Sequence, residues 1–110
     1  SLVMMLELYH RKIISLKKIV EKMCHNPATL FRIKKRGFIR EGYYADICIV
    51  DPDCSWTVSK DNILYKCGWS PLEGTTFRSK VRKTLVNGTI VFNDGIINED
   101  YRGQRLKFDR

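Results

Sequence analysis

The stretch KVRKTLVNGTIVFNDG, residues 80–95, carries the clearest structural signal in the sequence. Two β-prone runs flank Asn87-Gly88. Both central residues of a type I′ turn need a positive φ, which Asn and Gly accept most readily. The stretch therefore predicts a β-hairpin over about residues 80–93. Beyond it, Ile96 and Ile97 predict the start of a further strand.

Weaker strand signals precede the hairpin. The apolar run 47–50 is closed by Asp-Pro-Asp at 51–53, which predicts a buried strand followed by a turn. Residues 37–100 are therefore expected to form a small, mostly-β unit. Three shorter elements are expected within it: a strand at 56–58, a helical turn at 59–65 and a shaped loop at 67–74.

The first third of the chain predicts helices. Residues 2–10 lack Gly and Pro and are rich in helix formers, so we expect a helix that is buried over most of its circumference. A second helix is expected over residues 16–25, with Ser15 as its N-cap. Its apolar side chains recur at helical spacing, at Leu16, Ile19, Val20 and Met23.

The segment MCHNPATLF, residues 23–31, places a cysteine beside a histidine and predicts a helix break. A residue before proline is pushed out of the α region, Asn is a favoured N-cap, and Pro is favoured at the first helical position. We therefore expect one helix to stop at about His25, Asn26 to cap the next, and Pro27 to begin it.

This third helix is expected to end at about Ile33, with Leu30 and Phe31 as its apolar contacts. Gly37 is the expected C-cap, since a glycine commonly follows the last helical turn in the left-handed conformation. Cations complement the helix dipole at this end, and the sequence supplies Lys34, Lys35 and Arg36.

Composition limits the classes of function. The chain has 110 residues, 44% of them hydrophobic, which suits one domain with a small core. The net charge of +8 allows nucleic acid, anionic membrane or acidic substrates as partners without requiring any of them. No apolar run approaches the roughly 18–20 residues of a membrane span. Four cysteines without a C-x-x-C pair, and no signal peptide at the start, predict reduced thiols in the cytoplasm.

The beginning of the sequence has no Met, and SLVMMLELY resembles the middle of a helix. This pattern indicates a piece of a longer protein, or else a processed or tagged chain.

The two histidines give little support for a metal site or a nucleophile. His10 and His25 lie on different predicted helices, and the neighbours Cys24 and His25 would point about 100° apart on a helix. A nucleophilic Cys24 would need a base in reach and a depressed pKa. We therefore expect Cys24 to be a packing residue and His25 to form local hydrogen bonds at a helix end.

The carboxylates show no arrangement that would separate their pKa values. Asp51 and Asp53 flank a proline, Asp46 precedes a predicted strand, and Glu99 and Asp100 lie near the tail. Turn and surface roles are therefore expected for all of them.

The run RIKKRGFIR, residues 32–40, is the strongest candidate for nucleic-acid binding. No helix-turn-helix, zinc-finger or RNA-recognition signature accompanies it, which argues against that role. The basic tail, residues 101–110, is expected to lie on a surface.

Four segments, in this order, resemble the C-terminal end of the dihydroorotase family of cyclic amidohydrolases: EKMCHNPATLF, REGYYADICIVDPDCSWTV, GWSPLEGTTFRSKVRKTLVNGTIVF and RGQRLKFDR. Within the third, WSPLEG at residues 69–74 resembles the family's WSPFEG element. The family's glycine-rich element before an apolar strand is matched in most positions, by Gly37, Gly42, Tyr43, Ala45, Asp46 and Asp51.

The resemblance implies a fold and a chemistry. Members of the family have a TIM-type (β/α)8 barrel and a small β-sandwich built from both chain termini. They interconvert dihydroorotate and N-carbamoyl-aspartate in pyrimidine biosynthesis, and one or two zinc ions activate the attacking water. The zinc ligands are an H-x-H pair, a carboxylated lysine, two further histidines and an aspartate at the end of the eighth barrel strand.

None of these ligand motifs occurs in the chain, so the resemblance assigns it no catalytic and no metal-binding residue and leaves the substrate-binding residues unknown. It implies an α+β fragment. Residues 1–36 would be the last helices of the barrel, and residues 37–110 the C-terminal strands of the composite β-sandwich with the tail. Zinc would belong to the full-length parent, and the chain alone is expected to be inactive.

This division predicts the partners. The rest of the dihydroorotase chain is the expected partner, and no membrane is expected. The isolated fragment should self-associate, because it would have an open sheet edge and exposed apolar side chains at Leu2, Met5, Leu6, Ile19 and Val20. The alternatives are a fragment of an allantoinase or dihydropyrimidinase, a non-catalytic dihydroorotase-like homologue and, from another class, a basic nucleic-acid-binding module.

Overall fold

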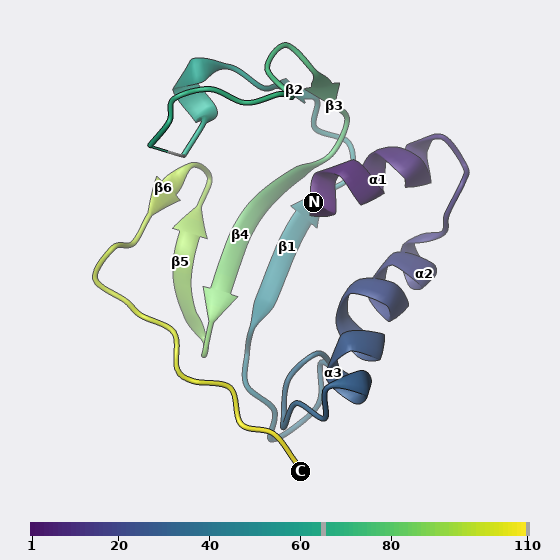
Figure 1. Ribbon diagram of the computed structural model, residues 1–110, viewed down its shortest axis with the longest axis vertical. Helices are drawn as coiled ribbons and strands as arrows, with labels where there is room; N and C mark the ends of the chain where they lie inside the picture. Colours follow the sequence, from purple (N-terminus) through teal and green to yellow (C-terminus); the bar gives the residue numbers. More distant parts are fainter. Residues whose placement is uncertain (65, 110) are drawn as a thin grey trace.

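The computed structural model describes residues 1–64 and 66–109, and it places helices before strands (Figure 1). The helical part consists of α1 (Leu2–His10), α2 (Leu16–Val20), the π-helical turn η1 (Glu21–His25) and α3 (Asn26–Leu30). The remainder contains β1 (Ile47–Asp51), β2 (Trp56–Thr57), the 3-10 turn η2 (Lys60–Asn62), β3 (Thr76–Phe77), β4 (Lys80–Val86), β5 (Thr89–Asn93) and β6 (Ile96–Ile97). The molecule is thus a mixed α+β structure, as the sequence predicts.

The hairpin predicted around Asn87-Gly88 is confirmed. β4 and β5 pair antiparallel, and Asn87 and Gly88 have φ values of 50° and 80°. β6 pairs with β5, and β1 pairs with β4, which gives a four-stranded antiparallel sheet in the order β1-β4-β5-β6. β2 and β3 form a separate two-stranded sheet. Of the helical turn expected at 59–65, the structure shows η2, and Tyr65 lies outside the described residues.

The helix break predicted at Asn26 is wrong. Val20, His25 and Asn26 all have right-handed helical backbone angles, and the backbone N–H of Asn26 bonds to the carbonyl of Glu21, five residues back. The π turn lies directly before Pro27, whose ring would clash with the carbonyl four residues back in a regular α-helix. The helix therefore passes through the proline by widening for one turn, without capping and restarting.

The predicted role of Gly37 is also wrong, because α3 ends at Leu30 and Phe31 takes the C-cap position. The expected end at Ile33 and the dipole role of the cations that follow it are not observed either. Gly37 has φ +81°, and a Cβ atom there would lie 2.5 Å from the Cβ of Ala28 and 2.7 Å from the carbonyl oxygen of Cys24. Only glycine lets this loop pack so closely against the helix.

The apolar core lies where α1 meets the strand β3. Leu6, Ile19, Val58 and Phe77 are each less than 9% exposed. α1 contacts both α2 and β3, and the carboxylate of Glu7 accepts hydrogen bonds from the backbone and the guanidinium of Arg78. Burial of Leu6 and Ile19 corrects the expectation that both would be exposed. Val20 is exposed, as expected, while Leu2 and Met5 are half-buried.

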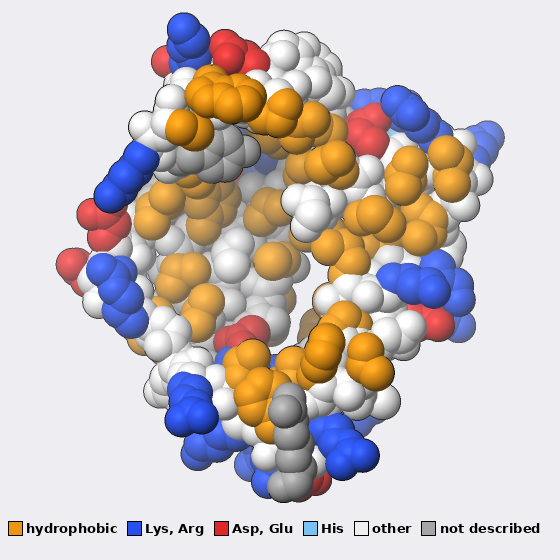
Figure 2. Space-filling model, viewed as in Figure 1, with side chains coloured by type: hydrophobic (Ala, Val, Ile, Leu, Met, Phe, Trp, Pro, Cys, Tyr) orange, Lys and Arg blue, Asp and Glu red, His pale blue; other side chains and the backbone are white. Residues whose placement is uncertain are grey.

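Other apolar side chains find less cover than the sequence predicts. Most of α1 is half-buried, Leu30 and Phe31 are 74% and 53% exposed, and Ile49 of the supposedly buried strand β1 is 47% exposed. Figure 2 shows hydrophobic side chains gathered over the first helices and around a hollow between helices and sheet. The radius of gyration, 15.3 Å, exceeds the roughly 13 Å of a compact domain of about this length. The four-stranded sheet and the helices therefore do not share one closed core.

None of the helices within residues 1–64 and 66–109 combines the length and the apolar character that crossing a membrane requires.

Replacing Gly37 by Ala should lower the free energy of unfolding more than replacing Gly42 by Ala. Both glycines have a positive φ, so each substitution incurs about 1 kcal/mol of backbone strain. The Gly42 site has no heavy atom within 4 Å of the added Cβ, whereas Gly37→Ala forces a further overlap that costs about 1–3 kcal/mol. Urea unfolding of both variants measures the difference, and equal losses would contradict the close contact.

Acid should weaken the attachment of α1 through Glu7. A hydrogen bond from the side chain of Arg78 and, to a smaller degree, one from its backbone N–H hold the pKa of Glu7 below its ordinary value. The resulting stabilisation is present above the ordinary pKa and is lost as the pH falls through the depressed folded value. Glu7→Gln should therefore lower stability at neutral pH and flatten its decline in acid, while Glu73→Gln in the loop 67–74 should leave that decline unchanged. Unfolding midpoints across pH test this.

Candidate functional site

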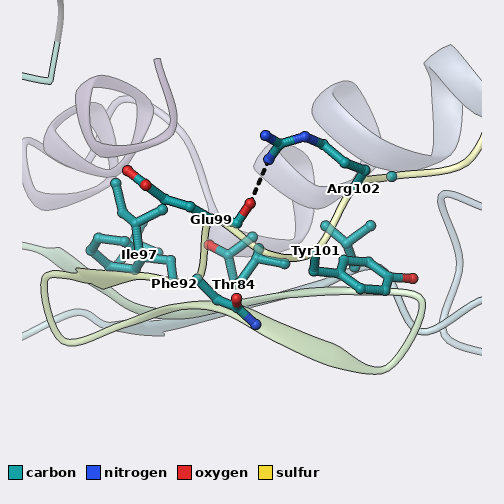
Figure 3. A pocket seen from close by; sticks show the side chains of 11 residues that line it. Thr84, Phe92, Ile97, Glu99, Tyr101 and Arg102 are labelled. Carbon is teal, nitrogen blue, oxygen red and sulfur yellow. Dashed lines mark hydrogen bonds between the residues drawn. The ribbon is translucent and has the colours of Figure 1, made fainter.

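A groove lies between the four-stranded sheet and the segment that follows β6, with a cavity volume of about 560 Å³ (Figure 3). Its apolar lining comes from β4, β5 and β6: Val81, Val86, Val91, Phe92 and Ile97. In Figure 3, Phe92 and Ile97 lie at one end of the groove and Tyr101 at the other. Such a concave apolar surface is suited to packing or binding.

The polar and charged residues that line this groove are Thr84, Asn98, Glu99 and Arg102. The guanidinium of Arg102 donates a hydrogen bond of 2.8 Å to the backbone carbonyl of Glu99, which curls the segment over the sheet (Figure 3). The backbone N–H of Asn98 donates to the carbonyl of Val91. These bonds position the wall of the groove. They create no pair of acid and base side chains in contact.

The neighbours Cys24 and His25 lie in different environments. The ring of His25 stacks on Phe38, with 4.2 Å between centroids and 7° between planes. The guanidinium of Arg40 covers Phe38 at 4.1 Å, and Tyr43 packs edge-on against the same ring. His25 is thus part of an aromatic stack, in place of the local hydrogen bonding expected from the sequence.

The thiol of Cys24 has the properties of a poor nucleophile. Cys24 is exposed, which corrects the packing role expected from the sequence, yet desolvation by nearby atoms and, to a smaller degree, the Cys48 thiol raise the pKa of its thiol. A higher pKa means less thiolate at neutral pH, and the thiolate is the reactive form.

A serine and a histidine meet where the sequence gives no hint of it. The Nε2 atom of His10 lies 2.8 Å from the Oγ of Ser79, which donates in turn to the backbone carbonyl of Pro52. The indole of Trp56 donates to the backbone carbonyl of Ser79, and Ser79 is 0% exposed. No substrate can reach a hydroxyl so deeply buried, so the pair anchors α1 to the start of β4.

Arg36 and Asp46 form an ion pair, which corrects the roles that the sequence suggested for both. Arg36 is 8% exposed, its guanidinium lies 4.2 Å from the centre of the Tyr44 ring, and it donates to the Oδ1 atom of Asn87 at 3.2 Å. Asp46 also accepts the backbone N–H of Asn87 at 2.8 Å. We call Arg36, Tyr44, Asp46 and Asn87 the Arg36 cluster.

The carboxylate of Asp51 has the turn role that was predicted. Asp51 accepts the backbone N–H of Asp53, and this bond, together with Arg82, holds the pKa of Asp51 below its usual range. Arg82 also pairs with Asp94 at 3.2 Å. Arg82 is the partner of Asp51 that the sequence did not reveal. The backbone N–H of Asp100 donates to the side chain of Asn98.

The basic run 32–40 does not form one continuous cationic surface. Arg36 points inward, Arg40 covers an aromatic ring, and Lys34 pairs with Asp109 at 3.5 Å. The segment around Ile33 forms an antiparallel bridge with Phe108. Residues 102–109 of the tail are exposed, as predicted, and Arg110 lies outside the described residues.

The zinc implied by the resemblance has no suitable set of donors in the part of the chain that the structure describes. No group of three or more His, Cys, Asp or Glu side chains there could hold a metal ion. Arginines and backbone amides engage the carboxylates of Asp46 and Asp51, and Phe38 and Ser79 engage the two histidines. The residues present therefore do not fit the metal.

Comparison with known proteins gives the family. Residues 2–91 match the family model described as the amidohydrolase family. A dihydroorotase of Pyrococcus abyssi is 40% identical over 103 residues, which are 94% of this chain and 25% of that protein. An allantoinase of Desulfitobacterium hafniense is 34% identical over 99 residues, 90% of this chain and 22% of that protein. The chain thus spans about a quarter of the length of these relatives.

The solved structures agree with this result. The L-hydantoinase of Arthrobacter aurescens superposes with a TM-score of 0.79 at 33% identity, over 89% of this chain and 22% of that one. The resemblance to dihydroorotase drawn from the sequence is confirmed as homology, while the names dihydroorotase, allantoinase and hydantoinase leave the substrate open. On these grounds, the chain belongs to the amidohydrolase family.

Proposed function

We propose that this chain is the C-terminal segment of a zinc-dependent dihydroorotase, which opens the cyclic amide of dihydroorotate to N-carbamoyl-aspartate and closes it again. The observation that carries the proposal is the 40% identity to a dihydroorotase over 94% of the chain. In this proposal residues 1–36 are helices from the end of the barrel. Residues 37–110 are the C-terminal part of the composite β-sandwich.

The contribution of this segment would be structural. Hydrolysis of an amide needs an activated water and stabilisation of the charge that develops on oxygen. The described residues offer no metal-binding group, and their one Ser-His contact is sealed from solvent. In this proposal zinc and the reacting groups belong to the remainder of the parent, and the chain by itself turns nothing over.

The exposed apolar surfaces support the proposal that the partner of this chain is the rest of the same enzyme. Ile13, Leu30 and Phe31 of the helical part are more than half exposed, and the groove beside β4 and β5 is lined by valines and Phe92. Apolar surface of this kind favours burial against another element. Without that partner we expect the chain to self-associate. Its four cysteines are all free, which fits the reducing cytoplasm.

A second candidate is the same structural role in another cyclic amidohydrolase. The allantoinase and L-hydantoinase relatives, at 34% and 33% identity, favour it. The WSPLEG and RGQRLKFD segments favour dihydroorotase.

A chimera tests the proposal. The matching quarter of the Pyrococcus abyssi dihydroorotase is replaced by this chain, and ring opening of dihydroorotate, allantoin and hydantoin is assayed with added zinc. We expect dihydroorotate turnover within about tenfold of the unaltered enzyme, because a supporting segment with the right fold costs little transition-state stabilisation. The purified 110-residue chain should show no turnover of any of the three.

Two results would contradict the proposal. Turnover by the 110-residue chain alone would show that it carries its own reacting groups. A chimera that fails to fold, or that folds and stays inactive, would show that the segment does not replace its counterpart. As a control, an unrelated 103-residue domain in the same position should abolish activity.

A further inference from the structure

The Arg36 cluster contains two buried nitrogen donors that have no acceptor within the described residues, the Nε of Arg36 and the Nδ2 of Asn87. The amide oxygen of Asn87 accepts from Arg36, so the orientation of this side chain is fixed by one strong donor. Its amide nitrogen has no hydrogen-bond acceptor in the part of the chain that the structure describes. Buried donors of this kind are rare and call for an explanation.

Asn87 precedes Gly88, and this pair has a reactivity of its own. The backbone nitrogen of the residue after an asparagine can attack the side-chain carbonyl carbon, and a following glycine offers no side chain to hinder the approach. Gly88 is exposed at the tip of the hairpin, where water and base have access. The hairpin turn requires two successive residues with positive φ, and the dipeptide that meets this requirement is chemically labile.

Three hydrogen bonds hold this dipeptide away from reaction. The backbone N–H of Gly88, the attacking group, donates to the carbonyl of Ala45 at 3.0 Å. The backbone N–H of Asn87 donates to Asp46, and the amide oxygen of Asn87 is bound by Arg36. To react, the Gly88 nitrogen must leave Ala45 and lose its proton, and the Asn87 side chain must turn towards it against the restraint of the hydrogen bond from Arg36.

We propose that Asn87-Gly88 is a deamidation site that the Arg36 cluster and Ala45 keep unreactive in the folded chain. In the reaction the Gly88 nitrogen bonds to Cγ of Asn87, the Cγ–Nδ2 bond breaks, and ammonia leaves with the proton. Water then opens the succinimide at either carbonyl and yields aspartate or isoaspartate. The co-reactant is water, and no oxidant or reductant takes part. The proposal is independent of the proposed function.

The two products would affect the fold differently. Aspartate at position 87 places a second carboxylate beside Arg36 and keeps the length of the backbone, so the hairpin persists. Isoaspartate adds a carbon to the main chain at a turn whose register is set residue by residue, and it separates β4 from β5. Spontaneous modification at this position would therefore produce one folded and one damaged form.

Peptide mapping by mass spectrometry tests the proposal on the 110-residue chain, incubated at mildly alkaline pH with and without urea. In urea, Asn87 should deamidate at least about tenfold faster than Asn62 and Asn98, which precede bulky residues. Without urea, the rate at Asn87 should fall at least about tenfold, because reaction then waits for local opening. An Asn87 that reacts equally fast in both conditions, or no faster in urea than Asn62, would overturn the proposal.

Two matched variants locate the protection. Arg36→Met should raise the rate at Asn87 in the folded chain, while Arg40→Met, which removes an arginine from the neighbouring aromatic stack, should leave it unchanged. Circular dichroism confirms folding of each variant. If Arg36→Met does not fold, a urea series on the unaltered chain decides: the rate at Asn87 should rise with the unfolded fraction. Equal rates for both folded variants, or a rate independent of urea, would contradict protection by the cluster.

Discussion

The ion pair between Arg36 and Asp46 ties together three parts of the chain that are distant in sequence. Arg36 follows the helical part, Asp46 stands immediately before β1, and both bind Asn87 at the turn between β4 and β5. A guanidinium that is 8% exposed cannot remain without a partner, since an unpaired buried charge costs several kcal/mol. The loop from residue 37 to residue 46 must therefore return to the place where it began. Gly37 makes this return possible by packing against Ala28 without a side chain.

Local chemistry predicted the elements of this fold better than their junctions. The hairpin follows from Asn87-Gly88 and the β-prone runs on either side of it, because few other residues accept two successive positive φ values. The prediction of a helix break at Asn26 was wrong. It rests on the local Asn-Pro pair, whereas the observed structure depends on how the helix accommodates Pro27. A π turn relieves the clash that a cap was expected to avoid, and no sequence pattern distinguishes the two solutions.

In the candidate site, too, local sequence patterns did not predict the contacts between residues that are far apart in the chain. Helix geometry predicts that Cys24 and His25 point apart, but it does not predict the stacking of His25 on Phe38. The contacts of Arg36 with Asn87 and of His10 with Ser79 join residues far apart in sequence, which periodicity cannot detect. The apolar run in β1 correctly predicted a strand. Its prediction of burial was wrong, because the described residues do not supply a surface that covers Ile49.

The bridge between Ile33 and Phe108 has a consequence for the order in which the chain can fold during synthesis. The backbone N–H of Lys34 donates to the carbonyl of Lys107, and that of Asp109 donates to the carbonyl of Arg32, so the linker after α3 is completed by residues far later in the sequence. A ribosome releases the N-terminal helices first, and these helices make mostly local contacts. The helices therefore form while the linker around Ile33 still lacks its bridge partner Phe108. Closure of this contact therefore waits until residues 107–109 have left the exit tunnel and can join a segment made much earlier.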